Sequence, residues 1–375
     1  MRTWLEISSK NLKHNLDQFR TLVGDEVKIA GIIKSNAYGH GLLEVAKVAD
    51  DRVDWFGVDS LDEALKLKEK GIYKPILILG YSELERLNEV VENGFHQVIA
   101  NLETLERLDT ITKENNKSAF VHLKIETGTS RQGILFDLLD LFLKIIKQNE
   151  NIKLAGASTH FANIEDTTDH SYAEEQLLKY KEAVRKIEEA GETDFIKHTA
   201  CSAATVLFPE TYFDLVRVGI SMYGLWSSGE TRISAKQKGL EINLKPVLTW
   251  KTKIAHLKNL PAGTPISYGC TEKLTSDSVL AVLPIGYWDG FDRSLSSVGN
   301  VLVNGQRCKV VGRVCMNMIV IDVTKVEGVK LEDEVVILGK QADDEITADE
   351  VASKLNTINY EVVTRINPVI KRVVV

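Results

Sequence analysis

The chain has 375 residues, of which 44% are hydrophobic and 26% charged, and its formal net charge is −7. This length fits two domains or one barrel with an addition, and the acidic balance argues against a protein that binds nucleic acid or an anionic membrane. No apolar run reaches the length of a membrane span, and the four cysteines are too scattered for a disulfide framework or a paired zinc site. We therefore expect a soluble cytoplasmic protein with reduced thiols and no metal.

The first 220 residues alternate short, β-rich apolar runs with stretches that have helical spacing. The runs are Ile29–Ile33, Trp55–Val58, Ile76–Leu79, Gln97–Ile99, Phe120–Ile125, Leu154–Thr159, Phe195–His198 and Leu215–Val218. Ser60, Ser82 and Asn101 each stand where a helix N-cap would open the next stretch. Eight β-then-α units favour a parallel (β/α)8 barrel of the TIM type. A doubly wound open sheet uses the same alternation, and the number of strands is what favours the barrel.

The pattern changes after Gly224. Residues 226–239 are rich in Ser, Gly and Lys and are typical of a connection. Strand-like runs then follow each other without intervening helices, at Val247–Leu257, Ser278–Pro284, Val301–Val310 and Ile319–Val323. Asn304-Gly305 is typical of a type I′ hairpin turn, and only Ile346–Leu355 looks helical.

We therefore predict that residues 1–240 form the barrel and residues 241–375 a mostly antiparallel β domain. The opening segment Thr3–Ile7, within the first ten or so residues, could join either part.

Basic residues recur where the predicted barrel strands end, which is where barrel enzymes build their sites. They are Lys34, Lys124, Arg131, His160, His198 and Arg217. Side chains of this kind on one rim repel each other, and an anionic ligand would relieve the repulsion. A phosphorylated ligand suits Ser202 and Gly219 near the last two strands.

Lys34 is also a good amine nucleophile if it is desolvated at the end of its strand. An amine next to phosphate-binding elements suggests pyridoxal 5′-phosphate (PLP), a cofactor that forms a Schiff base with lysine. A site for a sugar phosphate or another anion stays open on these residues alone.

The segment AGIIKSNAYGHG at residues 30–41 closely resembles the PLP attachment segment of alanine racemases. Further landmarks of that family follow in the same order, at residues 124–131, 160–162, 217–220, 266–269, 284–287, 312–316 and 359–362. The resemblance covers nearly the whole chain, and it implies a PLP-binding barrel followed by a C-terminal β domain.

The resemblance also implies roles for individual residues. Lys34 would bind PLP covalently, and Arg217 would face the pyridine nitrogen, oriented by His160. Arg131 would lie near the phenolic oxygen of PLP and the substrate carboxylate, and Lys124 matches a lysine that is often carbamylated. The phosphate would be contacted by Tyr38, Ser202, Gly219, Ile220 and Tyr360.

Racemisation removes a proton from one face of Cα and returns it on the other, which is simplest with two opposed groups. The resemblance assigns these roles to Lys34 and Tyr268. Tyr268 and Met316, whose backbone N–H would meet the substrate carboxylate, would come from a second subunit, and Tyr287 would line the entrance. A homodimer with composite sites follows. The implied reaction interconverts L-alanine and D-alanine, and the implied use of D-alanine is bacterial cell-wall synthesis.

Residues 129–132 and 367–369 depart from the family pattern, and so do two single positions, Cys201 and Asn317. Cys201 stands where an asparagine usually precedes the phosphate-binding serine, and Asn317 stands where an aspartate usually follows the methionine. These changes leave alanine as the expected substrate and widen the range to serine or other small amino acids. Three different functions stay open on the same fold: an amino-acid decarboxylase, a non-catalytic PLP-binding or homeostasis protein, and a sensor domain without catalysis.

Overall fold

The computed structural model describes residues 1–375, which divide into two compact units. The barrel unit comprises Leu12–Ser35 and Ala46–Lys245. The β unit comprises Met1–Asn11, Asn36–Val45 and Pro246–Val375. Two short segments near the N-terminus therefore belong to the same unit as the C-terminal part of the chain.

The barrel unit is built on eight strands that all run parallel. They are β2 (Lys28–Ile32), β3 (Trp55–Val58), β4 (Ile76–Ile78), β5 (His96–Ile99), β6 (Ala119–Lys124), β7 (Ile152–Ser158), β8 (Ile196–His198) and β9 (Leu215–Val218). Strand β9 pairs with β2, and backbone hydrogen bonds from Asp214 N to Lys197 O (3.0 Å) and from Arg217 N to Ala200 O (2.9 Å) link the β8 and β9 segments. The barrel is nearly closed, which confirms the predicted fold.

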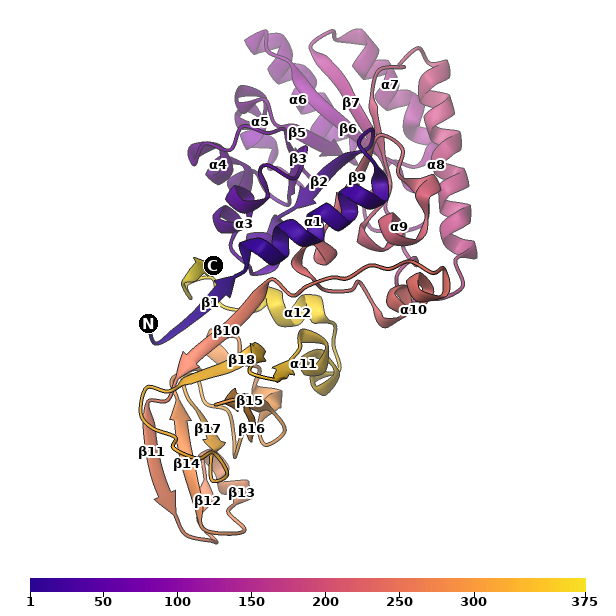
Figure 1. The fold of residues 1–375 in the computed structure, drawn as a ribbon. Helices are drawn as coiled ribbons and strands as arrows, with labels where there is room; N and C mark the ends of the chain where they lie inside the picture. The colour runs from indigo at the N-terminus through magenta and orange to yellow at the C-terminus, as the bar shows by residue number, and fades with distance from the viewer. The chain divides into compact units, whose positions relative to one another are not determined.

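Helices alternate with these strands, and Figure 1 shows α4 to α8 on the outside of the barrel. The helices up to residue 240 are α1 (Ser9–Val23), the short α2 (Lys34–Tyr38), α3 (Leu42–Ala49), α4 (Leu61–Glu69), α5 (Leu87–Asn93), α6 (Leu102–Asn115), α7 (Leu139–Gln148), α8 (Ser171–Glu189), α9 (Ser202–Leu207) and α10 (Gly229–Gln237). Helix α7 shows why they pack there, since Leu139, Phe142, Leu143 and Ile146 recur every three or four residues and are all buried.

The predicted helix starts are confirmed at two positions and wrong at one. The side chain of Ser60 accepts a hydrogen bond from Glu63 N, and that of Asn101 accepts one from Thr104 N. Ser82 caps no helix, because its hydroxyl donates to Gln97 Oε1 at 2.7 Å in the interior. Helix α10 lies in the stretch for which the sequence predicted only a connection.

The β unit is mostly antiparallel, as predicted. Its main sheet contains β1 (Thr3–Ile7), β10 (Leu248–Lys253), β15 (Asn300–Val303), β16 (Gln306–Lys309), β18 (Glu334–Gln341), β19 (Asp344–Ile346) and β20 (Arg372–Val374). A second sheet contains β11 (His256–Leu260), β14 (Ser278–Leu283) and β17 (Ile319–Asp322), and a short ladder joins β12 (Pro265–Ile266) to β13 (Glu272–Lys273). Strand β1 pairs with β10 and β20, so the opening segment belongs to this sheet.

The structure of the β unit differs from the sequence prediction in two details. The single run predicted at Val247–Leu257 is two strands, because the chain leaves the main sheet after β10 and enters the second sheet as β11. Two helices are present, α11 (Ala348–Leu355) and the unpredicted α12 (Asn359–Thr364). The hairpin between β15 and β16 is confirmed, with φ of 50° at Asn304 and 76° at Gly305.

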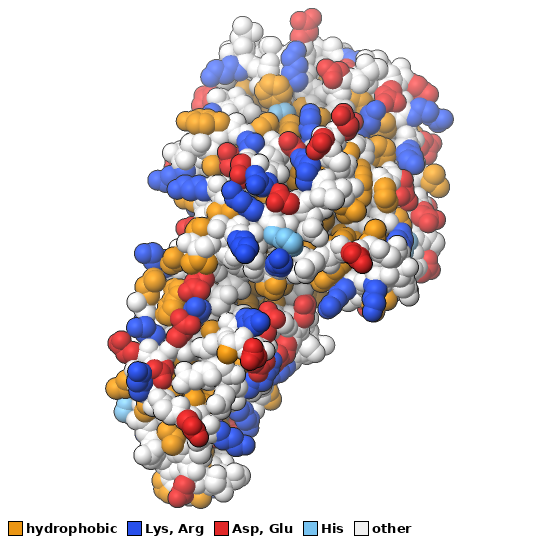
Figure 2. All heavy atoms as spheres, in the orientation of Figure 1, with side chains coloured by type: hydrophobic (Ala, Val, Ile, Leu, Met, Phe, Trp, Pro, Cys, Tyr) orange, Lys and Arg blue, Asp and Glu red, His pale blue; other side chains and the backbone are white.

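Single turns of 3₁₀ helix complete the description. They are η1 (Leu84–Arg86), η2 (Phe136–Leu138), η3 (Pro209–Thr211), η4 (Ile220–Tyr223), η5 (Tyr268–Cys270), η6 (Tyr287–Asp289) and η7 (Arg293–Leu295). None of the helices combines the length and the apolar character needed to cross a bilayer. Acidic and basic side chains are interspersed over the face seen in Figure 2.

Candidate active site

Eight of the predicted site residues belong to the barrel unit, and they lie at or beyond the carboxyl ends of its strands. Because the strands are parallel, their carboxyl ends share one rim of the barrel. The residues are Lys34 after β2, Lys124 and Arg131 at and after β6, His160 after β7, Ser202 after β8, and Arg217, Gly219 and Ile220 at and after β9.

The basic residues of this rim are close enough to act on one another electrostatically. Burial and the positive charges of Lys124, Arg217, Arg131 and Lys34 together hold the pKa of His160 well below its usual value. The neutral form of His160 is therefore favoured, and Arg217, Arg131 and Lys34 are cationic groups near it. Such a site favours an anionic ligand.

Arg217 is buried, and neutral acceptors fix its guanidinium. Nη1 donates to His198 Nδ1 and His198 O, both at 2.8 Å, and Nη2 donates to Thr159 O at 2.8 Å and Thr199 O at 2.9 Å. The expectation that His160 orients Arg217 is therefore wrong, since the imidazole in contact is that of His198. The physical reason is position: His198 ends β8, next to β9, whereas His160 lies beyond the end of β7.

Lys34 opens α2 (Lys34–Tyr38), directly after the buried Ile33. Its Nζ lies 3.4 Å from Asp59 Oδ1, and about a third of its side chain (37%) is exposed. The amine is thus held at the strand end and is accessible.

The turn that follows Lys34 is left-handed. Ser35, Asn36, Ala37 and Tyr38 have φ of 55°, 54°, 53° and 52°, a conformation that costs a non-glycine residue roughly 1–2 kcal/mol. Four such residues in succession persist only where the surrounding structure stabilises them, and strain of this kind concentrates at functional sites.

His40 is one of the groups that stabilise this turn. Its Nδ1 lies 3.1 Å from Ala37 O and 3.0 Å from Tyr38 O, so the ring N–H donates to carbonyls of the turn. Asn36 Oδ1 accepts from Leu42 N at 2.9 Å on the other side of the turn. Burial lowers the pKa of His40 to about 4, which keeps the ring neutral. His40 therefore has a structural role.

Ser202, Gly219 and Ile220 lie together between β8 and β9. Ser202 Oγ accepts hydrogen bonds from Gly219 N at 2.9 Å and Ser221 N at 3.5 Å. A hydroxyl that accepts two hydrogen bonds has its own proton left to donate. Ser202 therefore offers a donor to an anionic group, whereas the Gly219 N–H is already donated to Ser202 Oγ.

Lys124 is half-buried at the end of β6. Burial, together with the charges of Arg217 and Arg131, places the pKa of its amine well below the usual value. Glu126 does not hydrogen-bond this amine, because its Oε1 accepts from Gly128 N at 2.6 Å and Ser130 N at 3.1 Å in the following loop. Burial and the two arginines therefore favour the neutral form of the Lys124 amine.

The remaining five predicted residues belong to the β unit. The rings of Tyr38 and Tyr360 lie together, with centroids 6.1 Å apart. Tyr268, Tyr287 and Met316 are exposed on short connections, with 73%, 43% and 54% of their surfaces accessible. Backbone hydrogen bonds from residues 287 and 288 to the carbonyls of residues 315 and 316 bring Tyr287 and Met316 together.

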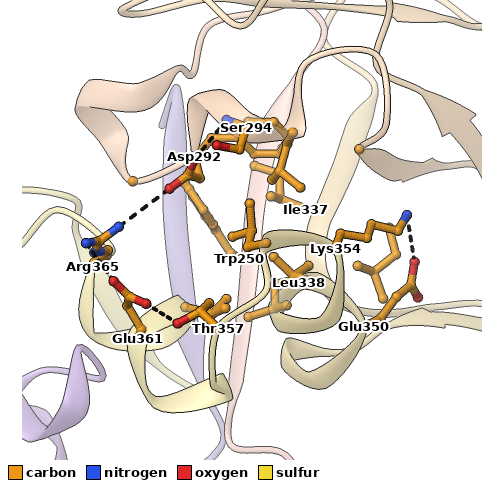
Figure 3. Close-up of a pocket in the computed structure, with 18 of the residues that line it drawn as sticks. Trp250, Asp292, Ser294, Ile337, Leu338, Glu350, Lys354, Thr357, Glu361 and Arg365 are labelled. Carbon is orange, nitrogen blue, oxygen red and sulfur yellow. Dashed lines mark hydrogen bonds and ion pairs between the residues drawn. The ribbon is translucent and has the colours of Figure 1, made fainter.

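A cavity of about 250 Å³ lies inside the β unit, and its lining includes none of the predicted site residues (Figure 3). Its apolar floor contains Trp250 and Leu338. Arg365 borders it and pairs with Asp292 at 3.5 Å and Glu361 at 2.6 Å. The pair with Asp292 links the C-terminal end of α12, the helix that carries Tyr360, to the loop before η7, whereas the pair with Glu361 lies within the helical segment itself.

Two features of the site were not predicted from the sequence: the contact of Arg217 with His198, and the left-handed turn after Lys34. Part of the signal for the first was present, since His122 and His198 lie on two of the predicted barrel strands, but spacing alone cannot show which side chains meet inside a barrel. Cys201 is the N-cap residue of α9, and burial raises the pKa of its thiol.

Comparison with known proteins identifies the family. The model of the alanine racemase N-terminal domain matches residues 7–227, and that of the alanine racemase C-terminal domain matches residues 247–374. The chain belongs to the alanine racemase family. Within this family, the alanine racemase of Leptospira interrogans is 39% identical over 377 residues, which span 100% of this chain and 96% of the relative.

Solved structures of alanine racemases share the whole fold. That of the Clostridium difficile alanine racemase matches with a TM-score of 0.93 at 36% identity, covering 100% of this chain and 96% of the other. The alanine racemase from Bacillus anthracis with bound L-Ala-P matches with a TM-score of 0.93 at 34% identity, covering 100% and 95%.

Proposed function

We propose that the protein is a PLP-dependent isomerase that interconverts L-alanine and D-alanine. The observation that carries this proposal is the buried Arg217, fixed by neutral acceptors on a rim that also presents the amine of Lys34. Membership of the alanine racemase family supplies the reaction and the substrate.

The residues present fit PLP. Its phosphate is an anion, and the Ser202 hydroxyl and the start of η4 at Ile220 offer donors beside β9. Its pyridine nitrogen is an acceptor, and Arg217 is a donor that is always protonated. Its aldehyde requires an amine, which Lys34 supplies. We propose Tyr38 and Tyr360, which lie together in the β unit, as further contacts of the phosphate.

When bound, PLP withdraws electrons from the Cα of an amino acid and so makes its proton more acidic. Arg217 determines how strongly this happens. A guanidinium does not give up its proton at neutral pH, so it hydrogen-bonds the pyridine nitrogen without protonating it. The electron demand at Cα is then moderate, which favours return of a proton over other reactions.

Two groups exchange the proton in this proposal. Lys34 Nζ takes or returns it on one face of Cα, and Tyr268 Oη does so on the other. Arg131 and the backbone N–H of Met316 bind the substrate carboxylate, and Tyr287 lines the approach. His160, kept neutral by its cationic neighbours, takes no proton from this exchange.

We propose that Lys124 is carbamylated. A neutral amine attacks carbon dioxide, forms an N–C bond and loses one proton, which leaves an anionic carbamate. The lowered pKa of Lys124 provides the neutral amine. The product would place a negative charge beside Arg131 and Arg217, which are otherwise in mutual repulsion. Mass spectrometry of the native protein and ¹³C NMR with labelled bicarbonate test this assignment.

We further propose a cytoplasmic homodimer with composite sites. Backbone hydrogen bonds join the segments of Tyr287 and Trp288 (61% exposed) to those of Met316 and Met318 (55%), and Ser267, next to Tyr268, lies 3.5 Å from Cys315 Sγ, so these exposed side chains come from neighbouring connections. Large apolar side chains gathered on a surface mark an interaction site. A second copy of the chain would cover this surface and place Tyr268 and Met316 in the site of its partner.

Replacement of the two proposed bases tests the reaction. Lys34→Ala should abolish the bound chromophore and the activity, whereas Tyr268→Phe should retain the chromophore and impair one direction of proton exchange more than the other. Lys28→Ala, at the opposite end of β2, and Tyr73→Phe, on an exposed tyrosine, are the matched controls. A coloured and active Lys34→Ala protein would refute the assignment.

Mixing the two variants, each impaired in racemisation, tests the composite site. A hybrid dimer of Lys34→Ala and Tyr268→Phe subunits has one site with both native residues, so mixing after mild dissociation should restore activity. If the mixture gains no activity although hybrid dimers form, each site is built within a single chain.

The substrate range is the second open assignment. Serine is the small amino acid that we propose as the alternative substrate to alanine. Cys201 changes the expected surroundings of the cofactor phosphate, and Asn317 changes those of the substrate carboxylate. Cys201→Asn should change the ratio of kcat/KM values between alanine and serine. An unchanged ratio would show that Cys201 does not set specificity.

A further inference from the structure

Three histidines form a chain of ring-to-ring hydrogen bonds inside the barrel, and the chain ends at Arg217. Arg217 Nη1 lies 2.8 Å from His198 Nδ1. His198 Nε2 lies 2.9 Å from His122 Nδ1, and His122 Nε2 lies 3.0 Å from His96 Nδ1. The chain begins at the first residue of β5 and passes through β6 and β8 to β9.

The direction of every hydrogen bond in this chain follows from Arg217. An arginine has donors only, so His198 Nδ1 must accept. A neutral imidazole carries one N–H, so His198 donates from Nε2 to His122 Nδ1, and His122 donates from Nε2 to His96 Nδ1. All three rings therefore carry their proton on Nε2.

The rings are kept in the neutral state on which this assignment depends. Burial holds the pKa values of His122 and His198 well below the usual value, and the charge of Arg217 acts in the same direction. Burial alone lowers the pKa of His96 to about 4.

The barrel wall is adapted to the chain where it crosses β7. A Cβ atom on Gly156 would lie 2.2 Å from His122 Nδ1 and 2.6 Å from its Cε1, so only glycine leaves space for the bond to His198. The β6–β7 ladder also shifts register here, because Val121 pairs with Leu154 and His122 pairs with Gly156. The irregularity adds one residue to β7 and places the glycine opposite the histidine.

The histidine chain begins at His96, which packs against aromatic side chains at the amino-terminal end of the barrel. The ring of Trp55 meets His96 edge-on at 4.5 Å between centroids, and Phe120 stacks on it at 5.0 Å. The same three residues line an open cavity with Lys28 and Asp214, which precede or begin their strands. His96 is thus held by aromatic side chains on the opposite rim from Lys34.

We propose that His122 and His96 are positioning residues that act through His198 to hold Arg217 in place against the cofactor ring. The proposal rests on the proposed function, in which Arg217 meets the pyridine nitrogen of PLP. Neither histidine touches that ring in this account. Their task is to keep Nδ1 of His198 an acceptor.

Loss of the last acceptor shows how the effect is transmitted. If His96 offers no acceptor, the Nδ1–H tautomer of His122 competes with the Nε2–H tautomer. In the Nδ1–H tautomer, the N–H of His122 points at His198 Nε2. His198 Nε2 must then accept this hydrogen bond, so the proton of His198 moves to Nδ1. Two donors then meet between His198 and Arg217, and the guanidinium loses one of its hydrogen bonds.

Nitrogen NMR on ¹⁵N-histidine-labelled protein tests the tautomers, because protonated and bare ring nitrogens have separate chemical shifts. We expect Nε2–H rings for His96, His122 and His198, both without PLP and with PLP bound. An Nδ1–H ring at His198 in the wild type would overturn the assignment.

Two substitutions at His96 separate positioning from packing. His96→Phe retains an aromatic ring and removes the acceptor, whereas His96→Asn retains an oxygen acceptor near the place of Nδ1. We expect His96→Phe to give mixed tautomers at His122 and His198, to weaken PLP binding by roughly 3- to 10-fold and to shift the absorption of bound PLP. His96→Asn should stay close to the wild type. Val98→Ala, a buried position on the same strand, should lower the Tm without these changes.

Gly156→Ala tests the same chain without replacing a histidine. Its methyl group should displace His122 and reproduce the tautomer and spectral changes of His96→Phe. If the wild type binds no PLP, the proposed function fails while the tautomer pattern can still be observed. If the wild type binds PLP and both variants leave the tautomers, the affinity and the spectrum unchanged, the positioning proposal is wrong.

Discussion

Gly39 ends the left-handed turn after Lys34, and its replacement by alanine offers a sharp test of how that turn is stabilised. Gly39 has φ of 83°, and a Cβ atom there would lie 2.0 Å from Val363 O and 2.9 Å from Val363 C. A methyl group at a left-handed position costs about 1–2 kcal/mol. The contact with the backbone of α12 adds about 1–3 kcal/mol, because the helix must retreat by at least about 1 Å. We expect Gly39→Ala to lower the free energy of unfolding by about 2–5 kcal/mol.

Gly263→Ala is the matched control. Gly263 lies in the same unit with φ of 80°, and its Cβ would meet no atom within 4 Å. Only the dihedral cost of about 1–2 kcal/mol applies there. Urea unfolding measures both values, and titration with PLP measures a second effect, because a displaced α12 moves Tyr360 away from Tyr38. Equal losses of stability in the two variants, together with wild-type PLP affinity in Gly39→Ala, would refute the proposed contact.

Three further predictions concern basic residues. Arg217→Lys keeps the charge but loses the planar fork that reaches acceptors on both sides, so stability and PLP affinity should fall together, as measured by unfolding and by titration. His40 and His96 have pKa values lowered from 6.5 to about 4. Between these pH values the unfolded chain therefore binds more protons than the folded chain. The free energy of unfolding should then fall as the pH decreases from 6.5 to 4, by about 3 kcal/mol for each histidine. Unfolding of His96→Asn across this range should show a smaller fall, and an unchanged slope would contradict the burial of His96. Lys124→Met should lower the free energy of unfolding and kcat/KM for alanine together, because it removes the carbamate charge proposed beside Arg131 and Arg217; urea unfolding and steady-state kinetics measure the two effects.

The sequence predicts the barrel well because its strands are short apolar runs separated by helices of clear period. It predicts the second domain less completely. Strand β18 joins the main sheet at Glu334–Gln341 and was not expected, and the six-residue α12 is too short to show a helical period. The break between β10 and β11 depends on which sheet each half joins, and this is decided by contacts distant in sequence.

The candidate site shows the same limit. Lys34 and Arg217 were predictable because strand ends and family motifs mark them. The imidazole that contacts Arg217 could not be predicted, because His160 and His198 both lie at strand ends. Only the packing shows which of them makes the contact. The space that Gly156 leaves for His122 depends on a register shift that no local pattern in the sequence reveals.

The most direct test of the central claim is incubation of the purified protein with PLP and L-alanine in D₂O. Loss of the α-proton is followed by NMR, and D-alanine is measured by chiral chromatography. We predict that deuterium enters Cα and that D-alanine accumulates until the two enantiomers are equal. If the protein binds PLP but neither exchanges the α-proton nor forms D-alanine, it is not an alanine racemase.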